Sequence, residues 1–243
     1  MKKIYLNCEN GVSGDMVLNA LIDLNEDPQS VRSEIHRISH LIGAPHEHHH
    51  EHSHNHNHDH EHDHNHDEHV HEHFHRSYSD VKHIIETLDV NDSVKAAAQQ
   101  IYTVIAKAES TVHGDSLEEL HFHEVGRDQA IANVVGVAVC LNELQADTVI
   151  VSDICDGHGT VKCAHGVLNV PVPAVKAMLD DCNLSYRQTE YEGEMVTPSG
   201  LAMVIGSGAV TGDRPEGIPV RTSEAFGGRR VGEHGLIVEL YMD

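Results

Sequence analysis

KKIYLNCENGVSGDM, residues 2–16, is the stretch that decides the fold class. Ile4–Leu6 is short and apolar, as in a strand, and a glycine-containing turn follows it. From Met16 onward, apolar residues recur on one face of a predicted helix, which should end near Asn25, before Pro28. A strand, a turn and a helix in this order form the building unit of α/β proteins.

Outside residues 46–75, the rest of the chain continues this alternation of helices and strands. Apolar spacing predicts helices over 30–42, 79–88, 92–113, 129–144, 173–181 and 198–205, and strands over 148–151, 161–170, 184–190, 218–225 and 235–241. Residues 157–159 are predicted to form a loop, Ser79 to cap its helix, and residues 116–119 to open a short element through a capping box. We therefore expect one α/β domain, residues 1–45 and 76–243, with a mixed sheet flanked by helices.

The charge of the chain narrows the classes of partner. Its 39 acidic and 16 basic residues give a formal net charge of −23, which argues against nucleic acid and against an anionic membrane surface as binding partners.

The sequence also bears on where the protein is located. No apolar run reaches about 18 residues, so we expect no transmembrane helix. The start of the chain reads as a strand and not as a signal peptide. Five scattered cysteines without a CxxC pair favour a reduced, cytoplasmic setting. The oligomeric state cannot be read from the sequence, which leaves a homo-oligomer open.

Composition changes sharply between His46 and His75, where 16 histidines alternate with Glu, Asp, Asn and Ser. Because this stretch has almost no apolar residues, we predict that residues 46–75 are a disordered insertion. Imidazoles bind divalent transition metals, and the carboxylates concentrate cations, so the regular spacing favours a mobile chelator. A solvated tract with incidental metal affinity is the alternative. The predicted metal ligands in this stretch are His48, His49, His50, His52, His54, His56, His58, His60, His62, His64 and His66.

A second histidine cluster, His121-Phe122-His123-Glu124, lies outside that stretch. In an extended segment His121 and His123 point to the same side, so two imidazoles and Glu124 could begin a metal site. His165 could complete this site if folding brings it near, and a polar loop is the alternative. Cys163 and His165 also leave a cysteine hydrolase open, although no nucleophile elbow accompanies them.

Two hydroxyl-rich turns precede predicted helices, at residues 11–15 and 197–200. Backbone N–H groups at a helix start favour a phosphate or a carboxylate, so these turns are candidate sites for an anion. Neither turn has the Walker or the GxGxxG pattern, and simple helix capping is the alternative. The candidate cofactor-binding residues are Gly11, Ser13, Gly14, Asp15, Thr197 and Ser199.

Taken together, these motifs resemble the LarC family, the nickel insertion proteins of nickel-pincer nucleotide cofactor biosynthesis. The resemblance rests on several motifs in the family's order, which span nearly the whole chain. They are Tyr5-Leu6-Asn7-Cys8 with residues 11–16, His121 to Gly126, Cys163 to Gly166, Pro171 to Ala174, and Glu192-Gly193-Glu194 with residues 197–200. A histidine-rich insertion at this place also resembles the family.

The resemblance implies a lyase-type enzyme component, a nickel chelatase. Such proteins insert nickel into pyridinium-3,5-bisthiocarboxylic acid mononucleotide and form carbon–nickel and sulfur–nickel bonds. The reaction depends on CTP, and a second divalent cation goes with the family's C-terminal portion, which this chain does not resemble. That portion would be a separate subunit, or the chain would be a truncated copy. In this reading His121, His123, Glu124 and His165 would present or position nickel. Gly11, Ser13, Gly14 and Asp15 would hold the nucleotide's phosphate or a counter-ion.

The chain departs from the family pattern where it carries amides in place of carboxylates. Asn7, Gln129 and Asn133 stand where the family usually has aspartate, and Asp128 lies one position away from the usual place. An amide binds a divalent cation more weakly and cannot act as a base. A non-catalytic nickel-binding or storage protein derived from the same family is therefore the alternative function.

Overall fold

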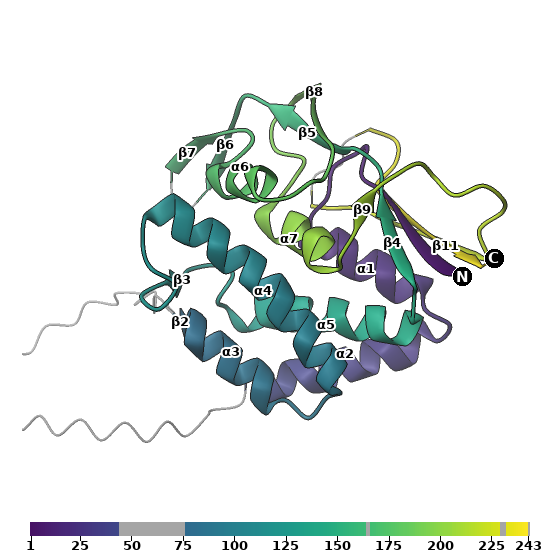
Figure 1. The fold of residues 1–243 in the computed structure, drawn as a ribbon, viewed down its shortest axis with the longest axis horizontal. Helices are drawn as coiled ribbons and strands as arrows, with labels where there is room; N and C mark the ends of the chain where they lie inside the picture. Colours follow the sequence, from purple (N-terminus) through teal and green to yellow (C-terminus); the bar gives the residue numbers. More distant parts are fainter. Residues whose placement is uncertain (44–75, 164–165, 229–231, 243) are drawn as a thin grey trace, which may run out of the picture.

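Helices and a five-stranded sheet make up most of residues 1–43, 76–163, 166–228 and 232–242, which the computed structural model describes (Figure 1). The helices are α1 (Gly14–Leu24), α2 (Pro28–Ile42), α3 (Tyr78–Thr87), α4 (Asp92–His113), α5 (Asp128–Leu144), α6 (Pro173–Asp180) and α7 (Pro198–Gly206). The strands are β1 (Lys2–Asn7), β2 (Arg76–Ser77), β3 (His121–Phe122), β4 (Thr148–Val151), β5 (Ile154–His158), β6 (Thr160–Cys163), β7 (Gly166–Asn169), β8 (Tyr186–Glu192), β9 (Val210–Thr211), β10 (Arg221–Ala225) and β11 (Leu236–Met242).

The main sheet is mixed and has the strand order β10-β11-β1-β4-β9. β1 lies at its centre, antiparallel to β11 and parallel to β4. Because Lys2 pairs with Met242, the two ends of the described chain lie side by side, as Figure 1 shows. The predicted mixed α/β sheet is thereby confirmed.

The two faces of the sheet differ in what covers them. α1 packs against β10 and β11, and α4 and α5 extend this layer of helices. Ile4 and Leu6 belong to the buried core, while Tyr5 alternates to the opposite face. There the buried Glu239 forms an ion pair with Arg214, which comes from the segment between β9 and β10. A buried carboxylate is tolerated because this guanidinium compensates its charge.

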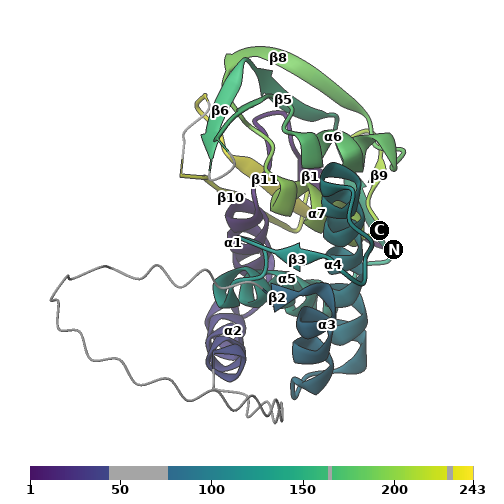
Figure 2. The same cartoon turned by 90° about the vertical axis from the view of Figure 1, so that its left-hand side faces the viewer.

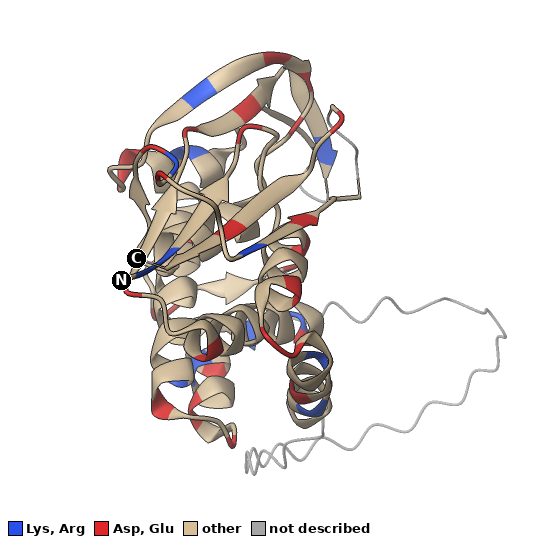
Figure 3. Ribbon diagram, turned by 90° about the vertical axis from the view of Figure 1, so that its right-hand side faces the viewer, with Lys and Arg blue, Asp and Glu red and all other residues tan. Residues whose placement is uncertain are grey.

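Three two-stranded pairs complete the fold. β5 pairs in parallel with β8, β6 forms a hairpin with β7, and β2 pairs with β3. Figure 2 shows β5, β6 and β8 at the end of the molecule opposite α2 and α3. Acidic and basic residues are both spread along the ribbon (Figure 3).

Most predicted elements occur where the apolar pattern indicated. α4 begins and ends as predicted, and α1 ends before Asn25. Three expectations are wrong. Residues 157–158 belong to β5, because the strand continues through a shift in register against β8. The helix cap is Ser77 and not Ser79, since Ser77 accepts from the backbone N–H of Asp80 in a reciprocal capping box. Ser116 does bond Glu119, but residues 117–119 form a turn and open no helix.

The predicted insertion, residues 46–75, lies outside the described residues. The chain on either side of it converges on the start of α5. Arg76 forms an ion pair with Asp128, and a Cβ built on Gly43 would lie 3.6 Å from a carboxylate oxygen of Asp128. Both attachment points of the histidine-rich segment are therefore close together. Over the four described ranges, no helix combines the length and the apolar character needed to cross a bilayer.

Candidate functional site

One cavity of about 530 Å³ brings the separate sequence motifs together. Its wall includes residues from the first turns of α1, α5, α6 and α7. Helix starts present unsatisfied N–H groups and a partial positive charge, so four of them around one cavity favour an anionic ligand. Among the predicted site residues, the wall contains Ser13, Gly14, Asp15, His123, Glu124, Thr197 and Ser199.

The starts of α1 and α7 are held against each other by backbone contacts. The N–H of Val12 donates to the carbonyl of Met195 at 2.9 Å, and the N–H of Thr197 donates to the carbonyl of Val12 at 2.9 Å. A Cβ on Gly200 would lie only 2.6 Å from the Cα of Ser13. The close approach of the two helix starts therefore requires glycine at position 200.

Both hydroxyl-rich turns act as helix caps. The hydroxyl of Ser13 accepts from the N–H of Met16 at 3.3 Å, and the hydroxyl of Thr197 accepts from the N–H of Gly200 at 3.2 Å. Ser199 lies within 3.3 Å of the Thr197 hydroxyl. The capping role is therefore present, and it does not compete with the anion role, because a cap satisfies only one of several N–H groups in the first turn.

A buried carboxylate that the sequence did not point to positions this part of the cavity. Asp156 on β5 accepts through Oδ1 from the N–H groups of Gly157 (2.8 Å), Met195 (2.8 Å) and Val196 (3.1 Å). Burial raises the pKa of Asp156, because desolvation outweighs these hydrogen bonds. Asp156 thus anchors the residues that lead into Thr197.

The side-chain amides of Gln129 and Asn133 form a chain of hydrogen bonds at the cavity. Gln129 donates to the side-chain oxygen of Asn133 at 2.8 Å, and Asn133 donates to Asp15 at 3.0 Å. Asn133 and Asp15 both line the cavity. Asp128 takes no part in this chain and instead pairs with Arg76. In this arrangement the Asp15 carboxylate accepts a hydrogen bond from an amide N–H.

The His121-Phe122-His123-Glu124 segment is fixed by its buried phenylalanine. Phe122 packs 5.9 Å from the ring of Tyr102, whose hydroxyl donates to the carbonyl of Val125 at 2.9 Å. His123 and Glu124 then lie on the cavity wall, whereas the exposed His121 pairs with Ser77 across the β2–β3 ladder and does not line the cavity. The histidine nearest to His123 along the described wall is His113, at a ring-centre distance of 6.3 Å.

Several predicted ligands lie outside the described residues: His165, and the histidines from His48 to His66. Cys163 does line the cavity and is exposed. Within the part of the chain that the structure describes, no three His, Cys, Asp or Glu side chains are grouped as ligands of one metal ion. His113 and Glu109 also line the cavity. Their spacing of four residues on the predicted helix 92–113 was the sequence signal that could have found them.

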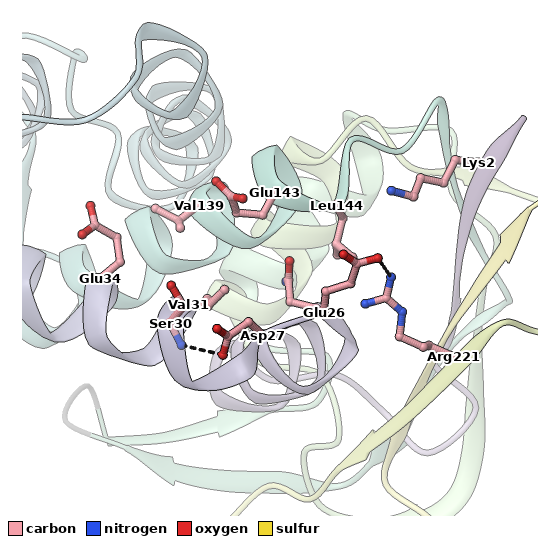
Figure 4. Close-up of a pocket in the computed structure, with 11 residues that line it drawn as sticks. Lys2, Glu26, Asp27, Ser30, Val31, Glu34, Val139, Glu143, Leu144 and Arg221 are labelled. Atoms are coloured by element: carbon pink, nitrogen blue, oxygen red, sulfur yellow. Dashed lines mark hydrogen bonds and ion pairs between the residues drawn. The ribbon is translucent and has the colours of Figure 1, made fainter.

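A second cavity, of about 520 Å³, lies between α2, the end of α5 and the edge of the sheet (Figure 4). Two of its carboxylates have structural partners. Asp27 caps α2 by accepting from the N–H of Ser30 at 3.0 Å, and Glu26 lies 3.2 Å from Arg221. No predicted site residue lines this cavity, so the candidate site is the first one.

The comparison with known proteins decides the family. A family model described as nickel insertion protein matches residues 4–242. This chain belongs to the nickel insertion protein family. The match spans β1 to β11, so it includes every element that lines the candidate site. No solved structure matches the chain.

Curated relatives of this nickel insertion family carry the same description. A pyridinium-3,5-bisthiocarboxylic acid mononucleotide nickel insertion protein of Alkaliphilus metalliredigens is 35% identical over 224 residues, which cover 83% of this chain and 51% of the relative. The protein of the same name from Acetivibrio thermocellus is 34% identical over 208 residues, covering 84% and 51%. A putative nickel insertion protein of Maridesulfovibrio salexigens is 40% identical over 252 residues, covering 94% and 60%. The chain spans about half the length of the first two relatives.

Proposed function

We propose that this chain takes part in inserting nickel into pyridinium-3,5-bisthiocarboxylic acid mononucleotide, as the N-terminal component of a lyase-type nickel chelatase. The observation that carries the proposal is the single cavity that joins four helix starts to a wall bearing His123 and Glu124. Its volume of about 530 Å³ is in the range of small-molecule sites. The substrate carries a phosphate and two thiocarboxylates, and such an anion suits the positive ends of the helices.

The proposed chemistry divides the cavity into two parts. The starts of α1 and α7, with Ser13, Gly14, Thr197 and Ser199, would bind the phosphate through backbone N–H groups and hydroxyls. The histidine-bearing wall would hold Ni²⁺ beside the pyridinium ring. One Ni²⁺ then forms a bond to the ring carbon, which loses its proton, and bonds to the two sulfur atoms. Glu124, which lies on the wall, would be the base that takes up that proton.

The histidine-rich segment supplies the metal in this proposal. Both chain ends that flank it meet at Asp128, at the first residue of α5. Arg76 pairs with Phe122 in the β2–β3 ladder, one residue before His123 on the cavity wall. A chelating segment attached there can release nickel close to the cavity, which raises the local concentration of the ion.

The proposal includes CTP, a second divalent cation and a C-terminal portion of the LarC type supplied as a separate piece. The test is an insertion assay with the full chain, NiCl₂, the mononucleotide, MgCTP and the C-terminal portion of a relative, with nickel incorporation read by mass spectrometry. H123A should reduce the rate about tenfold or more, as loss of a metal-binding group does, while H83A on the exposed face of α3 should not. Equal rates for wild type and H123A would refute this assignment.

A nickel-binding or storage protein is the second candidate, and the amide chain from Gln129 through Asn133 to Asp15 favours it. A storage protein would bind nickel and yield no product in the assay above, with or without CTP. Restoring three aspartates together (N7D, Q129D and N133D) discriminates between the two functions. A gain of insertion activity would indicate a degenerate enzyme, and loss of existing activity would indicate an enzyme adapted to the amides.

A further inference from the structure

His113 has the environment of an oriented metal ligand. It is the last residue of α4, which Gly114 terminates in the left-handed conformation at φ 78°. Its Nε2 lies 3.2 Å from a carboxylate oxygen of Glu109, one turn earlier on the same helix. Both side chains are partly buried, at 32% and 20% exposure, and both line the candidate cavity. A carboxylate on one ring nitrogen fixes the tautomer and directs the other nitrogen, Nδ1, to a metal.

The distance between His113 and His123 suits a shared ion. Their ring centres are 6.3 Å apart and their planes are inclined at 48°. Because a metal–imidazole bond is about 2.1 Å and the nitrogen lies about 1.1 Å from the ring centre, two imidazoles on opposite sides of one ion have centres about 6.4 Å apart. The observed ring-centre distance of 6.3 Å is therefore compatible with a divalent ion between the two imidazoles.

Two imidazoles are few ligands for a metal ion, and a small number of protein ligands makes transfer of the ion to a substrate easier. A resident metal usually has a closed set of protein ligands, whereas a site with open positions accepts ligands from a substrate. The described ranges contain no group of three or more His, Cys, Asp or Glu side chains that could hold a metal ion. An ion held in this way can be passed to the two sulfur atoms and the ring carbon of an incoming nucleotide.

We propose that His113 and His123 form a two-imidazole nickel site on the cavity wall, with Glu109 as the residue that orients His113. This differs from the His121–His123 pair that the sequence suggested, because His121 lies off the cavity. The direction of transfer rests on the proposed function, but binding of nickel by the pair does not.

Residue-specific protection of histidine tests this site in the full chain, where the histidine-rich segment also binds nickel. Diethyl pyrocarbonate acylates unliganded imidazoles, and peptide mass spectrometry reports each histidine separately. With NiCl₂ in excess over all histidines, and MgCl₂ as the control, His113 and His123 should be protected together and His121 should not. E109Q should raise the nickel concentration needed for protection about tenfold or more. E118Q, in the exposed turn after α4, is the matched control.

The decisive comparison is between H113Q and H121Q. Loss of nickel protection at His123 in H113Q, with retention in H121Q, supports the site. Unchanged protection at His123 in H113Q, or no protection of either residue in wild type, overturns it. If H113Q fails to fold, H123Q gives the same information through protection of His113. Because no nucleotide is present, an inactive chain with this protection pattern would refute the proposed function alone.

Discussion

Asn133→Asp is the substitution with the most informative outcome, because it replaces an attractive contact with Asp15 at the cavity by a repulsive one. Asn133 now donates to a carboxylate oxygen of Asp15 at 3.0 Å. The introduced carboxylate removes this donor, and a hydrogen bond to a charged group contributes about 1.5–3 kcal/mol. Two unit charges at about 3 Å also repel by about 1.4 kcal/mol in water and about 5.5 kcal/mol at an effective dielectric constant of 20.

Side-chain rotation relieves part of this repulsion, since Asp15 is exposed and Asn133 only half-buried. We therefore expect N133D to lower the free energy of unfolding by about 1–3 kcal/mol at pH 7 in EDTA. Repulsion raises the pKa of the introduced carboxyl above its unfolded value of about 3.9. The loss of stability in N133D is therefore complete above the raised pKa. It disappears as the pH falls toward the pKa of the unfolded state.

Urea unfolding of wild type and variant, followed by circular dichroism between pH 7 and 4.5, measures these differences. Mg²⁺ should restore stability to N133D, because paired carboxylates are ligands of this ion, and the histidine-rich segment interferes little with a metal that prefers oxygen. Asn169→Asp, exposed on β7, adds the same charge away from Asp15 and serves as the control. Equal destabilisation of both variants, or no effect of Mg²⁺ on N133D, would refute the reasoning.

Three further substitutions test the packing around the site by urea unfolding. Gly200→Ala should cost about 1–3 kcal/mol, because its Cβ would lie 2.6 Å from the Cα of Ser13 at the start of α1. Gly228→Ala, with open space around it, should be nearly neutral. Ser77→Ala should cost about 1 kcal/mol through loss of the capping box, and Ser79→Ala less; the reverse order would contradict the cap. Asp156→Asn should flatten the pH dependence of stability: burial raises the pKa of this carboxyl, so wild type loses stability as the pH rises from about 3.9 through the raised value. An unchanged pH profile would show that Asp156 is not the titrating group.

Most elements of the fold followed from local patterns, and the exception β5 has a non-local cause. The apolar spacing from Val94 to Ala108 predicted α4 correctly, because burial on one helix face recurs with the helical period. β5 was missed because Gly157 resembles a loop residue. Its strand conformation is imposed by the parallel pairing with β8, which lies some thirty residues further along the chain.

The candidate site was only partly predictable. Ser13 and Thr197 could be recognised as helix caps, since a cap depends on residues within one turn. Their joint position on one cavity depends on the backbone bonds between Val12, Met195 and Thr197, which join segments far apart in sequence. No sequence pattern marked Asp156, because its carboxylate accepts hydrogen bonds from backbone groups of a segment far along the chain.

For the histidines, too, the sequence predicted one part and the tertiary structure decided the other. By itself the sequence determined the α/β class and predicted metal binding by the histidines, because composition and periodicity are local properties. It also suggested that His121 and His123 act together, from their spacing alone. The tertiary structure placed His123 beside His113, at the end of another helix, and left His121 off the cavity wall. Which imidazoles share a cavity depends on how α4 packs against the residues that precede α5, and burial of Tyr102 and Phe122 in the core decides that packing.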